Sequence, residues 1–192
     1  TLLDPFGRAV FQQRDFNSIN ASGDHGPTTL GLSGRYTLLL EARYYRADTG
    51  SYSLRVQPVS NETLPLALDV VQNQSIAHAG QVDTYNFTLA EAKRVYFDSL
   101  TANVAGRDSW YLRWTLSGPT GVLVADRSFR ESDSYDGLSV FDLGPGDYTL
   151  SVRAVASETD LTGDYSFRLL DLSSAPLLTT GTPVSSVLNP AN

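Results

Sequence analysis

Two stretches of the chain, GRYTLLLEA at residues 34–42 and GDYTLSVRA at residues 146–154, share a Gly-x-Tyr-Thr-Leu opening. In the second stretch, apolar and polar side chains alternate strictly. This period of two predicts a β-strand with one buried and one solvent-facing side, which is typical of antiparallel sheets. The residues predicted to point inward are Tyr148, Leu150, Val152 and Ala154.

The same alternation recurs in DTYNFTL (83–89), WYLRWTL (110–116) and DYSFRLL (164–170). Gly-Pro clusters between these stretches predict tight turns. Only LAEAKRV (89–95) has helix-forming composition, enough for one or two turns at most. The pattern predicts an all-β, antiparallel sandwich or barrel. Its further inward side chains are predicted to be Tyr85, Phe87, Leu89, Trp110, Leu112, Trp114, Leu116, Tyr165, Phe167 and Leu169.

The two opening stretches belong to a longer internal repeat. Tyr36 aligns with Tyr148, TGSYSLRV (49–56) aligns with TGDYSFRL (162–169), and the segment from Thr1 echoes the segment from Thr115. Three anchors in the same order predict a tandem unit of about 112 residues. We expect 1–60 to be the second half of one unit, 61–172 a complete unit, and 173–192 a linker or first strand of the next.

The repeated tyrosine follows a turn, as in LGPGDY at residues 143–148. Tyr148 is expected to enter the core with its ring, so its hydroxyl needs a nearby partner. A backbone group a few residues upstream would serve, as in the tyrosine corner of sandwich folds. We therefore interpret this motif as a folding device and not as a ligand site.

Charge and composition exclude several classes of function. The net charge is −7, from 14 basic and 21 acidic residues, and this disfavours nucleic acid and anionic membranes as partners. The chain has no cysteine for a disulfide or a thiolate site, and no apolar run long enough for a membrane span. The acidic, Ser- and Thr-rich composition favours a secreted or surface-attached bacterial protein. The chain looks cut from a longer one, because no leader follows Thr1.

Catalytic signals are weak. The two histidines, His25 and His78, stand in loop-like sequence and at different places in the repeat, and no Gly-x-Ser-x-Gly nucleophile motif occurs. We expect a protein that is not an enzyme. A glycan-processing enzyme is kept only as a weaker alternative to the two non-catalytic functions described at the end of this section.

Two kinds of binding residue stand out. DRSFRESDSYDG at residues 126–137 places Asp126, Glu131, Asp133 and Asp136 on one connection, where their oxygens could hold calcium. The alternative is an ordinary acidic loop, and no cofactor other than calcium is indicated. Among the aromatic residues, both tryptophans are predicted to be core residues, with Tyr111 and Arg113 facing outward. The candidate surface aromatics are therefore Tyr44, Tyr45 and Tyr111.

The complete unit resembles the bacterial pre-peptidase C-terminal domain family. The matching segments are AGQVDTYNFTL (79–89), YFDSL (96–100), LRWTLSGPTGVLVAD (112–126), FDLGPGDYTLSVRA (141–154) and GDYSFRL (163–169). The resemblance implies a jelly-roll-like β-sandwich without catalytic activity. It also implies attachment to secreted peptidases, or arrays in large bacterial surface proteins, with binding to insoluble polymers or proteins and sometimes to calcium.

These observations predict a structural or adhesive module of a repetitive extracellular protein. Its half-unit would expose strand edges, so we expect self-association with other copies of the repeat or chain. The alternative is a carbohydrate- or protein-binding module appended to a secreted hydrolase, with a polysaccharide or a matrix protein as its partner.

Overall fold

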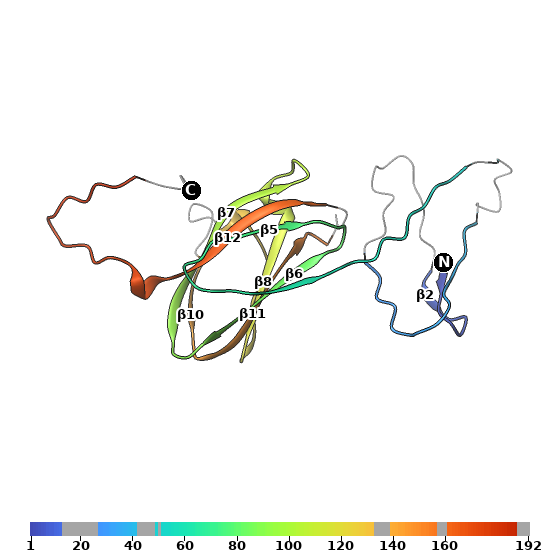
Figure 1. Cartoon of the computed structure of the whole chain (residues 1–192), viewed down its shortest axis with the longest axis horizontal. Coiled ribbons are helices and arrows are strands. Elements are labelled where there is room, and N and C mark those ends of the chain that lie inside the picture. The colour runs from blue at the N-terminus through green and yellow to red at the C-terminus, as the bar shows by residue number, and fades with distance from the viewer. Residues whose placement is uncertain (13–26, 42–48, 50, 133–138, 157–160, 188–192) are drawn as a thin grey trace. The chain divides into compact units, whose positions relative to one another are not determined.

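The computed structural model describes residues 1–12, 27–41, 49, 51–132, 139–156 and 161–187, which fall into two compact units, Thr1–Pro58 and Val59–Asn192 (Figure 1). Strands and short 3-10 turns make up the regular structure of these residues. None of their helical segments is long and apolar enough to cross a membrane.

The second unit contains two sheets. The five-stranded sheet has the order β4 (Glu62–Pro65), β6 (Val82–Leu89), β11 (Gly146–Ala154), β8 (Leu112–Gly118) and β9 (Gly121–Ser128). The four-stranded sheet has the order β10 (Val140–Leu143), β7 (Lys93–Val104), β12 (Gly163–Asp171) and β5 (Gln72–Ile76). Three 3-10 turns complete it: η1 (Ser109–Tyr111), η2 (Arg130–Ser132) and η3 (Leu172–Ser174).

The predicted all-β sandwich is confirmed, with one departure from purely antiparallel pairing. β4 runs parallel to β6, with Glu62 beside Asp83 and Pro65 beside Asn86. Between these two strands the chain crosses to the other sheet as β5 and then returns, so β4 and β6 run in the same direction. The remaining pairs of the second unit are antiparallel.

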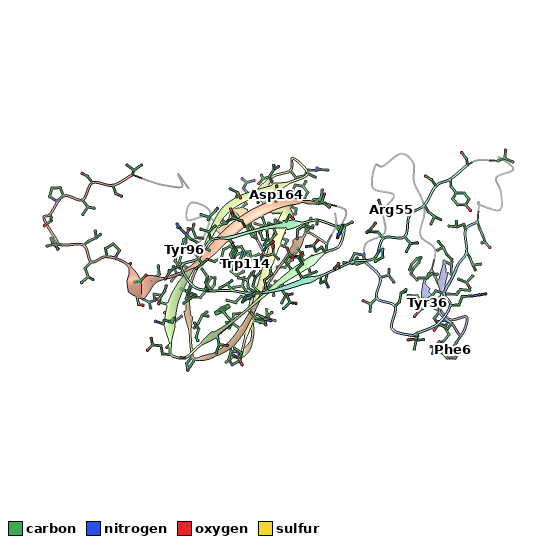
Figure 2. All side chains as sticks on the ribbon, viewed as in Figure 1. Phe6, Tyr36, Arg55, Tyr96, Trp114 and Asp164 are labelled. Carbon is green, nitrogen blue, oxygen red and sulfur yellow. The ribbon has the colours of Figure 1, made fainter. Side chains whose placement is uncertain are left out.

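The two sheets enclose one aromatic core. Trp114 of β8, labelled in Figure 2, is buried in this core. It stacks on Phe97 of β7 with ring centroids 4.0 Å apart, and Phe97 stacks in turn on Phe167 of β12. The indole N–H of Trp114 donates to Ser132 Oγ at 2.7 Å, which satisfies its polar atom inside the core. The alternation predicted for β6, β11 and β12 is confirmed, because their inward residues are all buried.

The tyrosine motif has the predicted geometry. Tyr148 Oη donates to the carbonyl oxygen of Gly144 at 2.9 Å, and its ring lies so close to Gly118 that a Cβ there would overlap it. Gly146 has a φ of 144° and faces Pro119 closely enough to exclude a Cβ. The glycine two residues before the tyrosine is therefore required both by backbone conformation and by space.

Local predictions at residues 89–95 and around Trp110 are wrong. Residues 89–95 form no helix: β6 ends at Leu89 and β7 begins at Lys93. The reason is that a segment this short does not compensate for the free-energy cost of nucleating a helix. Trp110 is not a core residue, since 39% of its surface is exposed, whereas Arg113 is buried. The reason is the turn η1, which replaces the strand period until β8 begins at Leu112.

The first unit contains a three-stranded antiparallel sheet in the order β2 (Ala9–Phe11), β1 (Leu2–Leu3) and β3 (Thr37–Leu38). Its tyrosine has the same local geometry as Tyr148. Tyr36 Oη donates to the carbonyl oxygen of Leu32 at 2.9 Å, and Gly34 has a φ of 138° and faces Pro5. In both units the bonded carbonyl lies four residues before the tyrosine.

Strand order and register also agree between the units. Under the sequence alignment, β2, β1 and β3 correspond to β9, β8 and β11, which are neighbours in the same order. The pairs Leu2–Leu38 and Leu3–Thr37 of β1 and β3 correspond to Leu116–Leu150 and Ser117–Thr149 of β8 and β11.

Candidate binding surface

The predicted site residues divide between described and undescribed parts of the chain. Tyr44, Tyr45, Asp133 and Asp136 lie outside the described residues, as does His25. Tyr111, Asp126 and Glu131 are described, and all three lie around β8 and β9. These strands and the turns η1 and η2 therefore carry the candidate surface.

The turn η1 places a tryptophan on this surface. Asp108 caps the turn by accepting a hydrogen bond from the backbone N–H of Trp110 at 3.1 Å. That bond is the main cause that holds the pKa of Asp108 below its usual range. The other carboxylate oxygen of Asp108 accepts from Arg130 Nη1 at 3.0 Å, which links η1 to η2.

A buried arginine lies against the tryptophan. The guanidinium carbon of Arg113 is 4.0 Å from the ring centroid of Trp110, in cation–π contact. Arg113 is only 8% exposed, and its Nε is buried without a hydrogen-bond partner among the described residues. Its Nη1 lies 3.8 Å from a Glu131 carboxylate oxygen and 3.4 Å from the backbone oxygen of Asp126.

The acidic residues on this surface are engaged with arginines and hydroxyls. Asp126 pairs with Arg153 through one carboxylate oxygen. Glu131 accepts from Ser128 Oγ at 2.9 Å, and this bond is the main cause that lowers the pKa of Glu131. The described residues contain no cluster of three or more potential metal ligands. The four-residue calcium site stays a prediction, because Asp133 and Asp136 are not described.

The backbone at Asp126 is in an unusual conformation. Its φ of 49° is in the left-handed region, which costs energy for a residue with a Cβ. The register between β8 and β9 shifts at this position, between the pairs Trp114–Arg127 and Leu116–Val124, as at a β-bulge. The bulge turns the Asp126 carbonyl toward Arg113 and its carboxylate toward Arg153.

Tyr111 was predicted to face outward, yet its ring is half-buried and packs against the core. It meets Trp110 edge to face, with ring centroids 5.3 Å apart. The guanidinium carbon of Arg107 lies 5.1 Å from the Tyr111 centroid. We call this row of alternating cations and rings, formed by Arg107, Tyr111, Trp110 and Arg113, the Trp110 surface.

A second polar cluster, which alternation alone did not predict, lies inside the sandwich. Asp83 is fully buried, and it accepts hydrogen bonds from Tyr165 Oη and Gln81 Nε2, both at 2.6 Å. The hydroxyls of Tyr165 and Tyr85 are 2.7 Å apart. Burial is the main cause that raises the pKa of both tyrosines well above the usual value. Each hydroxyl has a partner, so this cluster fixes the interior and offers no open site.

Of the two histidines, His78 lies within the described residues. The backbone N–H of His78 donates to Gln81 Oε1 at 3.2 Å, in the turn between β5 and β6. One groove of this unit lies over β6. It has a volume of about 440 Å³ and is lined by Leu66, Phe87, Lys93 and their neighbours.

No family model matches the chain, and no curated protein matches it. Among solved structures, the chain is similar to the pre-peptidase C-terminal domain of collagenase from Bacillus anthracis, at 16% identity and a TM-score of 0.40, over 60% of this chain and 99% of that one. It is also similar to PliG of Salmonella Typhimurium, a periplasmic inhibitor of g-type lysozyme, at 21% identity and a TM-score of 0.43, over 57% and 97% of the two chains.

A mutant of the Escherichia coli PliG inhibitor is similar at 16% identity and a TM-score of 0.41, over 57% of this chain and 99% of that one. With identities this low and TM-scores below 0.5, the family of the chain stays a prediction.

Proposed function

We propose that the chain is a non-catalytic, structural or adhesive part of a repetitive protein outside the bacterial cytoplasm. Val59–Asn192 would hold one complete repeat, and Thr1–Pro58 would hold the second half of another. One observation carries this proposal: β2, β1 and β3 have the order and register of β9, β8 and β11, with the same tyrosine geometry beside them. Shared sequence and shared local structure together favour a repeated building block.

Self-association follows from the open edge of the first unit. In the complete unit, β11 pairs with β8 on one side and with β6 on the other. In the described part of the first unit, β3 pairs only with β1. Leu39 N donates to Thr1 O, so the N–H of Leu38 points away from β1 in the alternating ladder. This edge would accept a strand from another copy.

Sedimentation of the 192-residue chain tests this part of the proposal. We expect concentration-dependent oligomers that the Leu38→Pro substitution removes, because proline eliminates the outward N–H without removing a bond to β1. Leu177→Ala is the matched control, since it removes an apolar side chain that is 97% exposed outside the sheet. A monomeric wild-type chain, or oligomers unaffected by Leu38→Pro, would contradict edge pairing.

The neighbouring gene sequence tests the array itself. We expect the codons before Thr1 to encode further units of about 112 residues, beginning with counterparts of β4 to β7. A peptidase or other hydrolase domain in that place would favour the second candidate, a binding module appended to an enzyme. That candidate has support in the Trp110 surface, where an exposed indole is held in a fixed position.

A further inference from the structure

The segment 52–56 of the first unit repeats the sequence of β12 but not its structure. Its residues YSLRV align with YSFRL at residues 165–169 of β12. Residues 51–58 nevertheless form no strand. Both neighbours of β12, which are β7 and β5, come from the part of the second unit that precedes β8. The described residues of the first unit supply no counterpart of either neighbour, so the segment has no strand to pair with.

The apolar side chains of this segment are exposed, although their counterparts in β12 are buried. Tyr52 is 75% exposed and Val56 is 81% exposed, whereas Tyr165 and Leu169 are each 1% exposed. Leu54, between the first two, is exposed as well. Adjacent exposed apolar side chains of this kind mark a surface that binds another protein segment.

The arginine of β12 is retained in the segment. In the second unit, Arg168 donates to the carboxylate of Asp98 on β7 at 2.6 Å, and Asp98 is buried. The counterpart of Arg168 is Arg55, which is labelled in Figure 2. Arg55 is exposed and forms no hydrogen bond or ion pair with another described residue. An exposed guanidinium beside exposed apolar side chains favours a partner that brings a carboxylate.

The hydroxyl groups of β12 are retained as well. Tyr165 Oη donates to Asp83 on β6 at 2.6 Å, and Ser166 Oγ lies 2.6 Å from Thr101 Oγ1 on β7. The same Tyr-Ser pair stands at residues 52–53. The residues that the segment shares with β12 are therefore those whose side chains form polar contacts with β6 and β7 in the second unit.

We propose that the segment 52–56 and the open edge of β3 together bind the β6–β7 segment of another copy of the repeat. β6 and β7 are consecutive in the chain and lie in different sheets of the second unit. One continuous partner therefore pairs with β3 through its first strand and with the segment 52–56 through its second. This inference rests on the proposed repeat, and it names the partner of the half-unit and the groups that recognise it.

A synthetic peptide tests the assignment with the intact 192-residue chain. The peptide carries residues 79–104, which contain β6 and β7. The second unit already holds this segment at a high effective concentration through the chain, so the added peptide is expected at the first unit. Fluorescence anisotropy of the labelled peptide should show saturable binding of one peptide per chain. A scrambled peptide of the same composition should bind at least tenfold more weakly.

Two aromatic residues of equal exposure separate this surface from unspecific apolar binding. Tyr52→Ala should weaken peptide binding at least tenfold and leave the urea midpoint of the chain unchanged, because Tyr52 is exposed. Phe6→Ala is the matched control. Phe6 is 76% exposed in the same unit, but it aligns with Thr120 in the turn between β8 and β9, away from the counterpart of β12.

A charge exchange tests the register of the complex. Arg55→Asp in the chain and Asp98→Arg in the peptide should each weaken binding at least tenfold, since each places like charges opposite one another. The two substitutions together should bind more tightly than either alone, because the ion pair forms again with its charges reversed. Losses that simply add would contradict this pairing.

The remaining outcomes distinguish this inference from the proposed function. The absence of saturable binding, equal binding of the scrambled peptide, or binding that survives Tyr52→Ala would overturn the assignment. A chain that stays monomeric in sedimentation yet binds the peptide would contradict pairing between chains and support this surface. Further repeat units encoded before Thr1, together with no peptide binding, would leave the repeat in place and reject the surface.

Discussion

The hydroxyl groups of Tyr85 and Tyr165 lie 2.7 Å apart inside the sandwich, and Tyr165 donates onward to the buried carboxylate of Asp83. The two residues come from opposite sheets, β6 and β12. The bond therefore joins the two layers by a polar contact inside the core. Hydrogen bonds of this kind fix which residues face each other across the layers.

This pair predicts a loss of stability at alkaline pH. Burial raises the pKa of both tyrosines, so the folded chain keeps protons that the unfolded chain releases above about pH 10. Their contribution to the free energy of unfolding is complete below that pH and declines as the pH rises. We expect the urea midpoint to be lower at about pH 11 than at about pH 9, and this difference to be smaller in Tyr165→Phe. Tyr52→Phe, at an exposed site, should retain the wild-type fall.

The requirement for a glycine at position 146, two residues before Tyr148, can be tested by comparison with Gly144. Gly146→Ala should lower the free energy of unfolding by more than about 1 kcal/mol, because a Cβ meets Pro119 and the backbone has a positive φ. Gly144→Ala is the matched control, since a Cβ there meets nothing within 4 Å. Equal effects of the two substitutions in urea unfolding would show that the turn tolerates a side chain.

The tyrosine hydroxyl itself should make a modest contribution. Tyr148→Phe removes the bond to the Gly144 carbonyl and should cost about 1 kcal/mol in the unfolding of the second unit. Tyr36→Phe removes the corresponding bond in the first unit, so it should leave the unfolding of the second unit unchanged. Unfolding of Tyr148→Phe at the wild-type urea concentration would contradict a stabilising role of the hydroxyl.

Calcium can be tested by melting with and without chelator. If Asp126 of β9 and the acidic residues after this strand bind the ion, calcium raises the melting temperature and Asp126→Asn reduces the rise. Asp126 must then exchange its ion pair with Arg153 for the metal, so Arg153→Gln should strengthen the response. Asp164→Asn, on β12, is the control. An unchanged melting temperature in excess calcium would remove the ion from the site.

Much of the sandwich could be predicted because burial repeats with the strand period. Tyr148, Leu150 and Val152 alternate along a strand whose one face is covered, and all are buried. The tyrosine hydrogen bond could also be predicted, because a buried hydroxyl next to a turn has few partners to choose from. These inferences use only local spacing and the cost of an unpaired polar group.

The Trp110 surface could not be predicted in the same way. The alternation in WYLRWTL continues through Trp110, but the structure interrupts it with η1. One local signal was present: Asp108 precedes Ser109 and Trp110 as a capping residue precedes a short helical turn. The contacts of Arg113 with Glu131 and Asp126 depend on the pairing of β8 with β9, which spacing does not reveal.

The parallel pairing of β4 with β6 bears on how the second unit responds to tension. Asp69, just beyond β4, bonds to Leu169 and Asp171, so the end of β4 and the end of β12 lie at the same end of the sandwich. The chain therefore enters at one end and leaves at the other. Stretching strains the hydrogen bonds between β4 and β6 together, along the strands. In single-molecule pulling, the wild-type unit must break the hydrogen bonds between β4 and β6 by shear before its strands can separate. We expect Leu64→Pro to lower the rupture force, because proline removes a backbone N–H from β4.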